Sequence, residues 1–110
     1  MNPTEYIDVS KLPSMSLSAK KDFPEIACVY LIIDACHHIH YVGGTANLRK
    51  RWMSHHKYSP ASLLDQPRLA YLEISPHLVW ETEAFLIRTL QPQLNLKTPS
   101  ESDLVNAALL

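Results

Sequence analysis

Residues 26–43 read IACVYLIIDACHHIHYVG, and their pattern is the strongest indication of the fold. The first part, 26–33, is an apolar run with β-branched side chains and Tyr30 inside it, which suits a buried strand better than a helix of that length. A second apolar segment, 39–42, follows after the short connection 34–38. Because so short a connection joins two strands only when they run antiparallel, the sequence predicts a β-hairpin.

A helix is expected to follow the hairpin. Gly43 and Gly44 weaken a strand, so we expect the sheet to break at this point. The next residues favour a helix that runs to about residue 57, because the side chain of Thr45 or Asn47 can cap its first turn.

The second half of the chain repeats the strand and helix signals. Residues 59–67 indicate a loop, and the alternating residues 68–74 indicate a third strand. Ser75 and Pro76 are typical of a helix start, and this helix is expected to end before Pro92. The predicted fold class is therefore α+β, a small three-stranded antiparallel sheet flanked by helices in the order β-β-α-β-α-α.

A chain of 110 residues fits one domain, because two separate cores would each be too small to offset the entropy of folding. Residues 1–24 are expected to form an N-terminal arm, since they are interrupted by prolines and lack periodicity. Residues 25–97 would form the folded domain. In 98–110, Ser100 and Asp103 resemble a capping box, which predicts a C-terminal helix or tail.

The composition is that of an ordinary globular protein, with 46% hydrophobic and 19% charged residues, which excludes a disordered chain. No apolar run is long enough to cross a bilayer, and the N-terminus lacks the pattern of a secretory signal. We therefore expect a cytoplasmic protein in which Cys28 and Cys36 are not paired.

The net charge of −1 excludes a protein that grips nucleic acid by bulk electrostatics. The charges are nevertheless segregated, because residues 35–64 contain no Asp or Glu. Four basic residues lie in that stretch: Arg49, Lys50, Arg51 and Lys57. They form either a solvated helix face or a pole that attracts phosphate.

One carboxylate falls where an apolar side chain is expected. The helix that starts at Ser75 has an apolar stripe made of Val79, Leu86, Ile87 and Leu90. At 100° per residue Glu83 lies in the middle of this stripe, beside Trp80. Burying an unpaired carboxylate costs several kcal/mol. Glu83 is therefore paired with Arg51 or Arg88, or brought to the surface by a rotation of the helix, or it is a general base or ligand of a divalent cation such as Mg²⁺.

Four other residues have the chemistry of a phosphodiester-hydrolysing site. Tyr30 and Tyr41 lie on adjacent predicted strands, where a tyrosine is also a common packing residue. Arg51 and His55 are four residues apart on the predicted helix and project side by side. A guanidinium can hold a phosphoryl group, and an imidazole can move a proton near neutral pH.

Five short motifs carry these residues in a fixed order. They are Cys28-Val29-Tyr30, Tyr41-Val42-Gly43, Asn47-Leu48 with Arg51-Trp52-Met53-Ser54-His55, Glu83, and Pro92-Gln93-Leu94-Asn95. In this order and spacing they resemble the GIY-YIG nuclease family, across about residues 27–96. The chain departs from the family at Cys28, which stands in place of a glycine, and at Gly44-Thr45-Ala46, where the family often has a small residue and a lysine.

The resemblance implies a metal-dependent endonuclease that hydrolyses phosphodiester bonds in DNA. Tyr30 would activate the attacking water or accept its proton with the help of His55, and Tyr41 would hydrogen-bond the phosphate or the water. Arg51 would stabilise the pentacovalent phosphate. Glu83 would hold a single Mg²⁺ or Mn²⁺ ion. The candidates for nucleic-acid binding are Arg49, Lys50, Lys57 and Asn95, of which Asn95 would also brace the site.

Two other functions stay open at this point. The near-neutral charge is compatible with a nucleic-acid-binding module that kept the fold but is catalytically weak or inactive. A zinc module is the other alternative, although the spacing of its candidate ligands fits no standard zinc pattern; these are Cys28, Cys36, His37, His38 and His40. The expected partners are DNA, no membrane, and a protein that supplies DNA targeting, with the chain a monomer or weak dimer.

Overall fold

The computed structural model describes residues 8–55 and 57–96. Its centre is an antiparallel sheet of four strands in the order β1-β4-β2-β3. The strands are β1 (Ser14–Ser16), β2 (Cys28–Ile33), β3 (Ile39–Thr45) and β4 (Arg68–Glu73). The α-helices are α1 (Leu48–Met53), α2 (Tyr58–Ser62), α3 (Val79–Leu90) and α4 (Gln93–Leu96), and the 3-10 helices are η2 (Val9–Lys11), η3 (Leu17–Asp22) and η4 (Pro76–Leu78).

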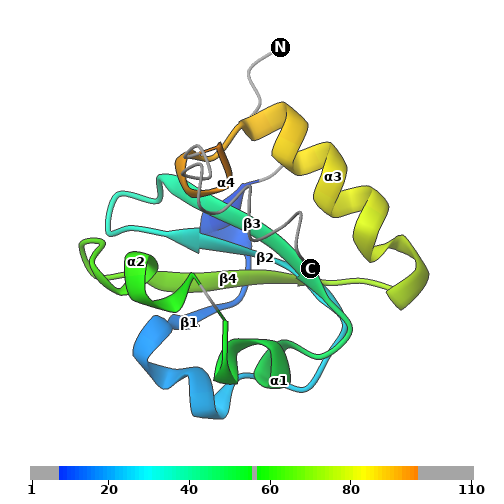
Figure 1. Ribbon diagram of the computed structural model, residues 1–110, viewed down its shortest axis with the longest axis horizontal. Coiled ribbons are helices and arrows are strands. Elements are labelled where there is room, and N and C mark those ends of the chain that lie inside the picture. The colour runs from blue at the N-terminus through cyan, green and yellow to red at the C-terminus, as the bar shows by residue number, and fades with distance from the viewer. Residues whose placement is uncertain (1–7, 56, 97–110) are drawn as a thin grey trace, which may run out of the picture.

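Helices cover the sheet on both sides. Helix α3 lies on one side, α1 and α2 lie on the other, and α4 lies beside β3 (Figure 1). Strand β2 is therefore buried along its whole length, as its continuous apolar run indicated. Its side chains alternate between two cores, with Tyr30 and Ile32 in the core under α1 and Val29 and Leu31 in the core under α3.

The hairpin and the α+β class are confirmed. Strand β2 pairs antiparallel with β3 and also with β4, so that Tyr30 lies between Gly43 on one neighbour and Tyr71 on the other. The third predicted strand is β4. The apolar stripe of α3 packs as expected, with Val79 and Leu86 buried.

The sheet has four strands and not the three predicted. The additional strand β1 lies within the segment expected to be an arm, and it pairs antiparallel with β4 from Ser14 opposite Ala70 to Ser16 opposite Arg68. The Arg68 side chain donates hydrogen bonds to the hydroxyl and the carbonyl of Ser14. Three residues are too few to indicate a strand by their pattern, although Met15 packs against the core; backbone hydrogen bonds to β4 keep the segment extended.

Three local expectations around and after the first helix are wrong. The strand does not break at Gly43 and Gly44 but continues through both glycines to Thr45. Helix α1, capped by the Asn47 side chain, ends at Met53 and not near residue 57, because Ser54 leaves the helical conformation. A short helix, α2, begins at Tyr58 and extends to Ser62, into the stretch 59–67 that was predicted as a loop.

Helix α3 begins after the 3-10 turn η4, which carries the predicted proline at its start. The helix ends at Leu90, and its C-cap residue Gln91 adopts a left-handed conformation before Pro92. The expected C-terminal helix or tail, 98–110, lies outside the described residues. Within the described part of the chain, no helix is long and apolar enough to span a bilayer. Both cysteines are free, Cys28 buried and Cys36 exposed.

Candidate active site

Two glycines in the edge strand β3 make room for groups from both faces of the sheet. A Cβ at Gly43 would overlap the ring and the hydroxyl of Tyr30 on one face. A Cβ at Gly44 would lie 2.6 Å from Cγ1 of Val79 and 2.9 Å from Oε2 of Glu83 on the other face. Successive residues of a strand point to opposite faces, so the pair clears both sides at once. This is why Tyr30 and Glu83 approach the same short length of backbone.

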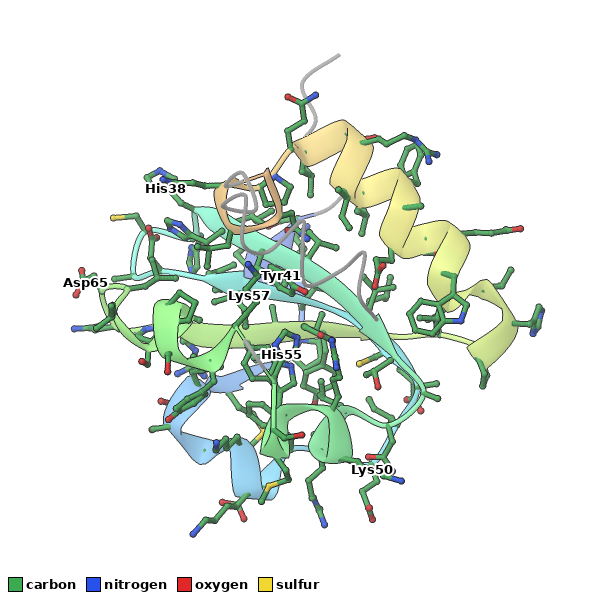
Figure 2. The ribbon with its side chains drawn as sticks, viewed as in Figure 1. His38, Tyr41, Lys50, His55, Lys57 and Asp65 are labelled. Carbon is green, nitrogen blue, oxygen red and sulfur yellow. The ribbon has the colours of Figure 1, made fainter. Side chains whose placement is uncertain are left out.

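Aromatic side chains hold Tyr30 in place on the α1 side of the sheet. Its hydroxyl lies 2.8 Å from Nε2 of His55. The Trp52 indole stacks on the His55 ring, with 4.1 Å between centroids and 14° between planes, and packs edge-on against Tyr30. The ring centroids of Tyr41 and His55 lie 5.5 Å apart with the rings perpendicular, and Figure 2 shows these two residues close together. Such close packing fixes the orientation of the Tyr30 phenol relative to the His55 imidazole.

The hydrogen bonds of His55 fix which atom carries its proton. The backbone N–H of Lys57 donates to Nδ1 of His55 over 2.9 Å. A backbone amide only donates, so Nδ1 is an acceptor, and the neutral ring bears its proton on Nε2. His55 therefore donates to the Tyr30 oxygen, and the hydroxyl hydrogen of Tyr30 points elsewhere. An imidazole in this tautomer stabilises negative charge on Tyr30 and does not take its proton.

Glu83 lies on α3, one turn after Val79, and its carboxylate reaches Gly44. Burial raises the pKa of Glu83, while the backbone N–H of Gly44 and the charge of Arg51 act in the opposite direction. None of the ion pairs among residues 8–55 and 57–96 includes Glu83, so the pairing with Arg51 or Arg88 considered above is not formed. The half-buried carboxylate is thus left to face a cleft.

This cleft has a volume of about 400 Å³ and crosses the β3 edge of the sheet. It is lined by Tyr30, Tyr41, Gly43, Gly44, Thr45, Arg51, Trp80 and Glu83. Four of the five candidate catalytic residues thus line one cleft, and the fifth, His55, is bonded to Tyr30 behind it. Burial raises the pKa of both phenols, and the neighbouring Arg51 guanidinium acts against that shift.

The four candidates for nucleic-acid binding lie in different surroundings. Arg49 donates from Nε to the carbonyl of Phe23 over 2.7 Å. Asn95 clamps Val42 of β3, since its Oδ1 accepts from the Val42 N–H over 2.8 Å and its Nδ2 donates to the Val42 carbonyl over 2.9 Å. Lys50 is exposed on α1, and Lys57 is partly exposed after it. In residues 8–55 and 57–96, no ion pair involves the ammonium group of either lysine, so of this set the two lysines are the ones available for a ligand.

Sequence reasoning missed three contributors to the site. Gly43 and Gly44 looked like strand breakers, although a pair of glycines between a strand tyrosine and a cap residue could have signalled a close approach. Trp80 was noticed only as a neighbour of Glu83, and the structure shows that it forms part of the cleft wall. No sequence signal reveals that the Lys57 amide sets the tautomer of His55.

The donor set of the cleft fits one hard divalent cation. A Mg²⁺ ion usually takes one or two protein carboxylates and completes its shell with water and phosphate oxygens. Glu83 supplies one such carboxylate, held by the Gly44 backbone and without a cationic partner in the described residues. Within the ranges that the structure describes, no three His, Cys, Asp or Glu side chains gather to hold a metal ion by themselves.

The residues of the zinc alternative do not converge. Burial, with a contribution from Glu73, raises the pKa of the Cys28 thiol to about 12, so this cysteine is not a thiolate ligand at neutral pH. At the hairpin tip, His40 bonds to the Asp34 carboxylate over 2.8 Å, and the amides of Cys36 and His38 bond to the same side chain. These contacts shape the turn.

A larger groove of about 530 Å³ lies elsewhere, lined by Glu25, Ile26, Ala27, Glu73, Ile74, Ser75 and Pro76. Its two charged residues are exposed carboxylates and none of its lining residues is basic, so it would repel a phosphate backbone.

Solved structures provide the comparison. The chain matches the GIY-YIG N-terminal endonuclease domain of UvrC from Thermotoga maritima bound to magnesium, with a TM-score of 0.61 and 19% identity over 72% of this chain and 93% of that one. A variant of that domain with asparagine replaced by alanine, bound to its catalytic divalent cation, gives a TM-score of 0.59 and 18% identity over 70% and 90% of the two chains. No protein-family model and no curated protein matches. The chain therefore has the fold of the GIY-YIG endonuclease domains.

Proposed function

We propose that this protein is an endonuclease that hydrolyses phosphodiester bonds in DNA with the help of Mg²⁺ or Mn²⁺. The observation that supports the proposal is the cleft over the β3 edge. It has a volume of about 400 Å³ and is lined by two phenols, a guanidinium and a carboxylate that forms no ion pair with a described residue. This combination offers a proton acceptor, a phosphate clamp and a metal ligand around one position.

Each side chain has a role that its surroundings allow. Tyr30 acts as a phenolate, which the Nε2–H of His55 stabilises; it orients the attacking water, accepts its proton and becomes the neutral phenol. Arg51 binds the non-bridging phosphate oxygens, whose negative charge grows as the water attacks. A metal ion held by Glu83, water and phosphate would supply further positive charge against the phosphate and the leaving oxygen.

The other contacts with DNA are assigned to basic side chains that are not already bonded to another described residue of the protein. Lys50 and Lys57 bind phosphates of the same DNA, since both side chains are at least partly exposed and neither forms an ion pair with another described residue. Arg49 and Asn95 already bond to main-chain atoms of Phe23 and Val42, so their role is to hold α1 and α4 in position for the site.

The decisive experiment replaces the candidate metal ligand. Glu83→Gln keeps the shape of the side chain and removes its charge, and we expect cleavage of plasmid DNA in Mg²⁺ to fall by more than about 100-fold, because the ion stabilises the transition state by several kcal/mol. Glu81→Gln is the matched control, since Glu81 is an exposed carboxylate on the same helix and does not line the cleft.

A chelator should abolish cleavage by the unmodified chain and by the Glu81→Gln variant alike. Undiminished cutting by Glu83→Gln, or cutting that persists in chelator, would remove the carboxylate and the ion from the mechanism. Binding of DNA by Glu83→Gln at unchanged affinity would show that the loss is catalytic.

The alternative function is a nucleic-acid-binding module of this fold that is weak or inactive as an enzyme. The observation in its favour is the burial of Tyr30, which is 1% exposed and has a raised pKa, so little phenolate exists at neutral pH. Stoichiometric DNA binding without Mg²⁺-dependent cleavage at any pH between about 6 and 9 would favour this module over the nuclease.

A further inference from the structure

The cleft has one wall residue that the proposed chemistry does not use. Trp80 lies in the first turn of α3, lines the cleft and is 62% exposed. Glu83 is three residues further along the same helix, so the two side chains are neighbours on one helical face. An indole is thus held open to solvent beside the candidate metal ligand.

Core packing does not account for this position. Val79 and Leu86 bury the apolar stripe of α3 against the sheet, whereas Trp80 is excluded from both apolar cores. The other tryptophan, Trp52, shows what a core indole looks like in this protein, because it is fully buried against His55 and Phe23. A large exposed aromatic ring on a cleft wall is better suited to binding than to folding.

The charge of the protein requires a contribution to DNA binding that is not electrostatic. The net charge is −1, and Arg51 is the one basic residue among those that line the cleft. Phosphate contacts alone would therefore give weak binding. An aromatic ring that stacks on a base adds affinity without any charge, and it does so for every base because each has a π-face.

Only an unpaired base can meet the ring in this way. In a continuous duplex both faces of a base are covered by its neighbours, and unstacking costs free energy before the base can reach a protein ring. In a single strand, a flap or a bulge the face is available. A base attached next to a phosphate bound by Arg51 is within reach of the residue beside Glu83.

We propose that Trp80 stacks on an unpaired base next to the phosphate in the cleft, and that the preferred substrate is therefore single-stranded DNA or DNA with a single-stranded branch. This inference rests on the proposed function for the position of the phosphate. It assigns Trp80 as a residue that determines substrate specificity.

Binding can be tested without cleavage, because the two tryptophans report separately. Trp52 is shielded, so a change in indole emission on binding comes from Trp80. In chelator, a single-stranded oligonucleotide of about 12 nucleotides should quench the emission, and the same sequence as a closed duplex should leave it unchanged. Trp80→Leu should lose the quenching, whereas Phe85→Leu, which removes another exposed ring of α3 outside the cleft, should keep it.

Cleavage supplies the second measurement. With Mg²⁺, Trp80→Leu should lower kcat/KM on single-stranded and flapped DNA by about 5- to 100-fold, the range expected for one base stack. The loss of kcat/KM on closed duplex should be much smaller, and Trp80→Tyr should restore most of the activity on single strands. Equal losses on both substrates, or no quenching by single strands, would overturn the assignment of Trp80.

These outcomes are separate from those that test the nuclease itself. Quenching by single strands in a chain that never cleaves supports the stacking site and overturns the proposed activity. Cleavage of duplex and single strands at equal rates, with emission unchanged on binding, supports the activity and overturns the stacking site.

Discussion

At Gly43 a single missing side chain gives Tyr30 its position. An alanine there would overlap the phenol, and a well-packed site answers such overlap with shifts that cost about 1–3 kcal/mol. We expect Gly43→Ala to lower the free energy of unfolding by that amount and to reduce cleavage. Chemical denaturation of Gly43→Ala, Tyr30→Leu and the double variant tests the cause, because removing the ring should relieve the overlap. Purely additive effects would disprove it.

The same phenol predicts a dependence of rate on pH. Burial raises the pKa of Tyr30 above its usual value near 10, so the phenolate is scarce at neutral pH and its fraction grows about tenfold with each pH unit. We expect the single-turnover rate in Mg²⁺ to rise continuously from about pH 6 to pH 9, and this rise to vanish in Tyr30→Phe. A plateau near neutral pH would identify a different base with a lower pKa.

At the scale of the element, the short helix α4 is joined to the edge strand β3 by one amide side chain. Asn95 both donates to and accepts from the backbone of Val42, which satisfies two main-chain groups that the edge strand would otherwise leave unpaired. Asn95→Asp replaces the donor with an acceptor, so we expect the free energy of unfolding to fall by about 1–3 kcal/mol. Thermal unfolding measures this, with Gln93→Ala on the exposed side of α4 as the control. Equal melting temperatures for the two variants would rule out the clamp.

At the scale of the whole molecule, the modest charge limits how strongly salt affects DNA binding. Three basic side chains, Lys50, Arg51 and Lys57, are assigned to phosphates, and each contact with a single strand contributes about −0.7 to the slope of log affinity against log salt. We expect a slope of about −2, measured on Glu83→Gln to prevent cleavage, and a slope shallower by about 0.7 in Lys50→Ala. A slope several times steeper would require a basic surface that these residues do not provide.

The hairpin and the last long helix are predictable from the sequence alone and are confirmed, and the residues of the candidate site are a prediction made from the same sequence. The apolar run that became β2 and the stripe around Glu83 are local periodicities, and each reports a buried face without reference to distant residues. The Glu83 carboxylate in that stripe is informative for the same reason. Burying it costs free energy of folding, which indicates that the position serves function.

The fourth strand, the full length of β3 and the cleft depend on contacts between distant parts of the chain, so they are seen only in the tertiary structure. Strand β1 has only three residues, two of them serines, and it becomes extended because β4 offers backbone partners more than fifty residues away, from Ser14 opposite Ala70 onward. The glycines of β3 stay in the sheet because Tyr30 and α3 fill the space that side chains would occupy. Contacts between residues far apart in the chain produce no periodic pattern of apolar residues in either segment. Their effect on the fold therefore cannot be predicted from local sequence.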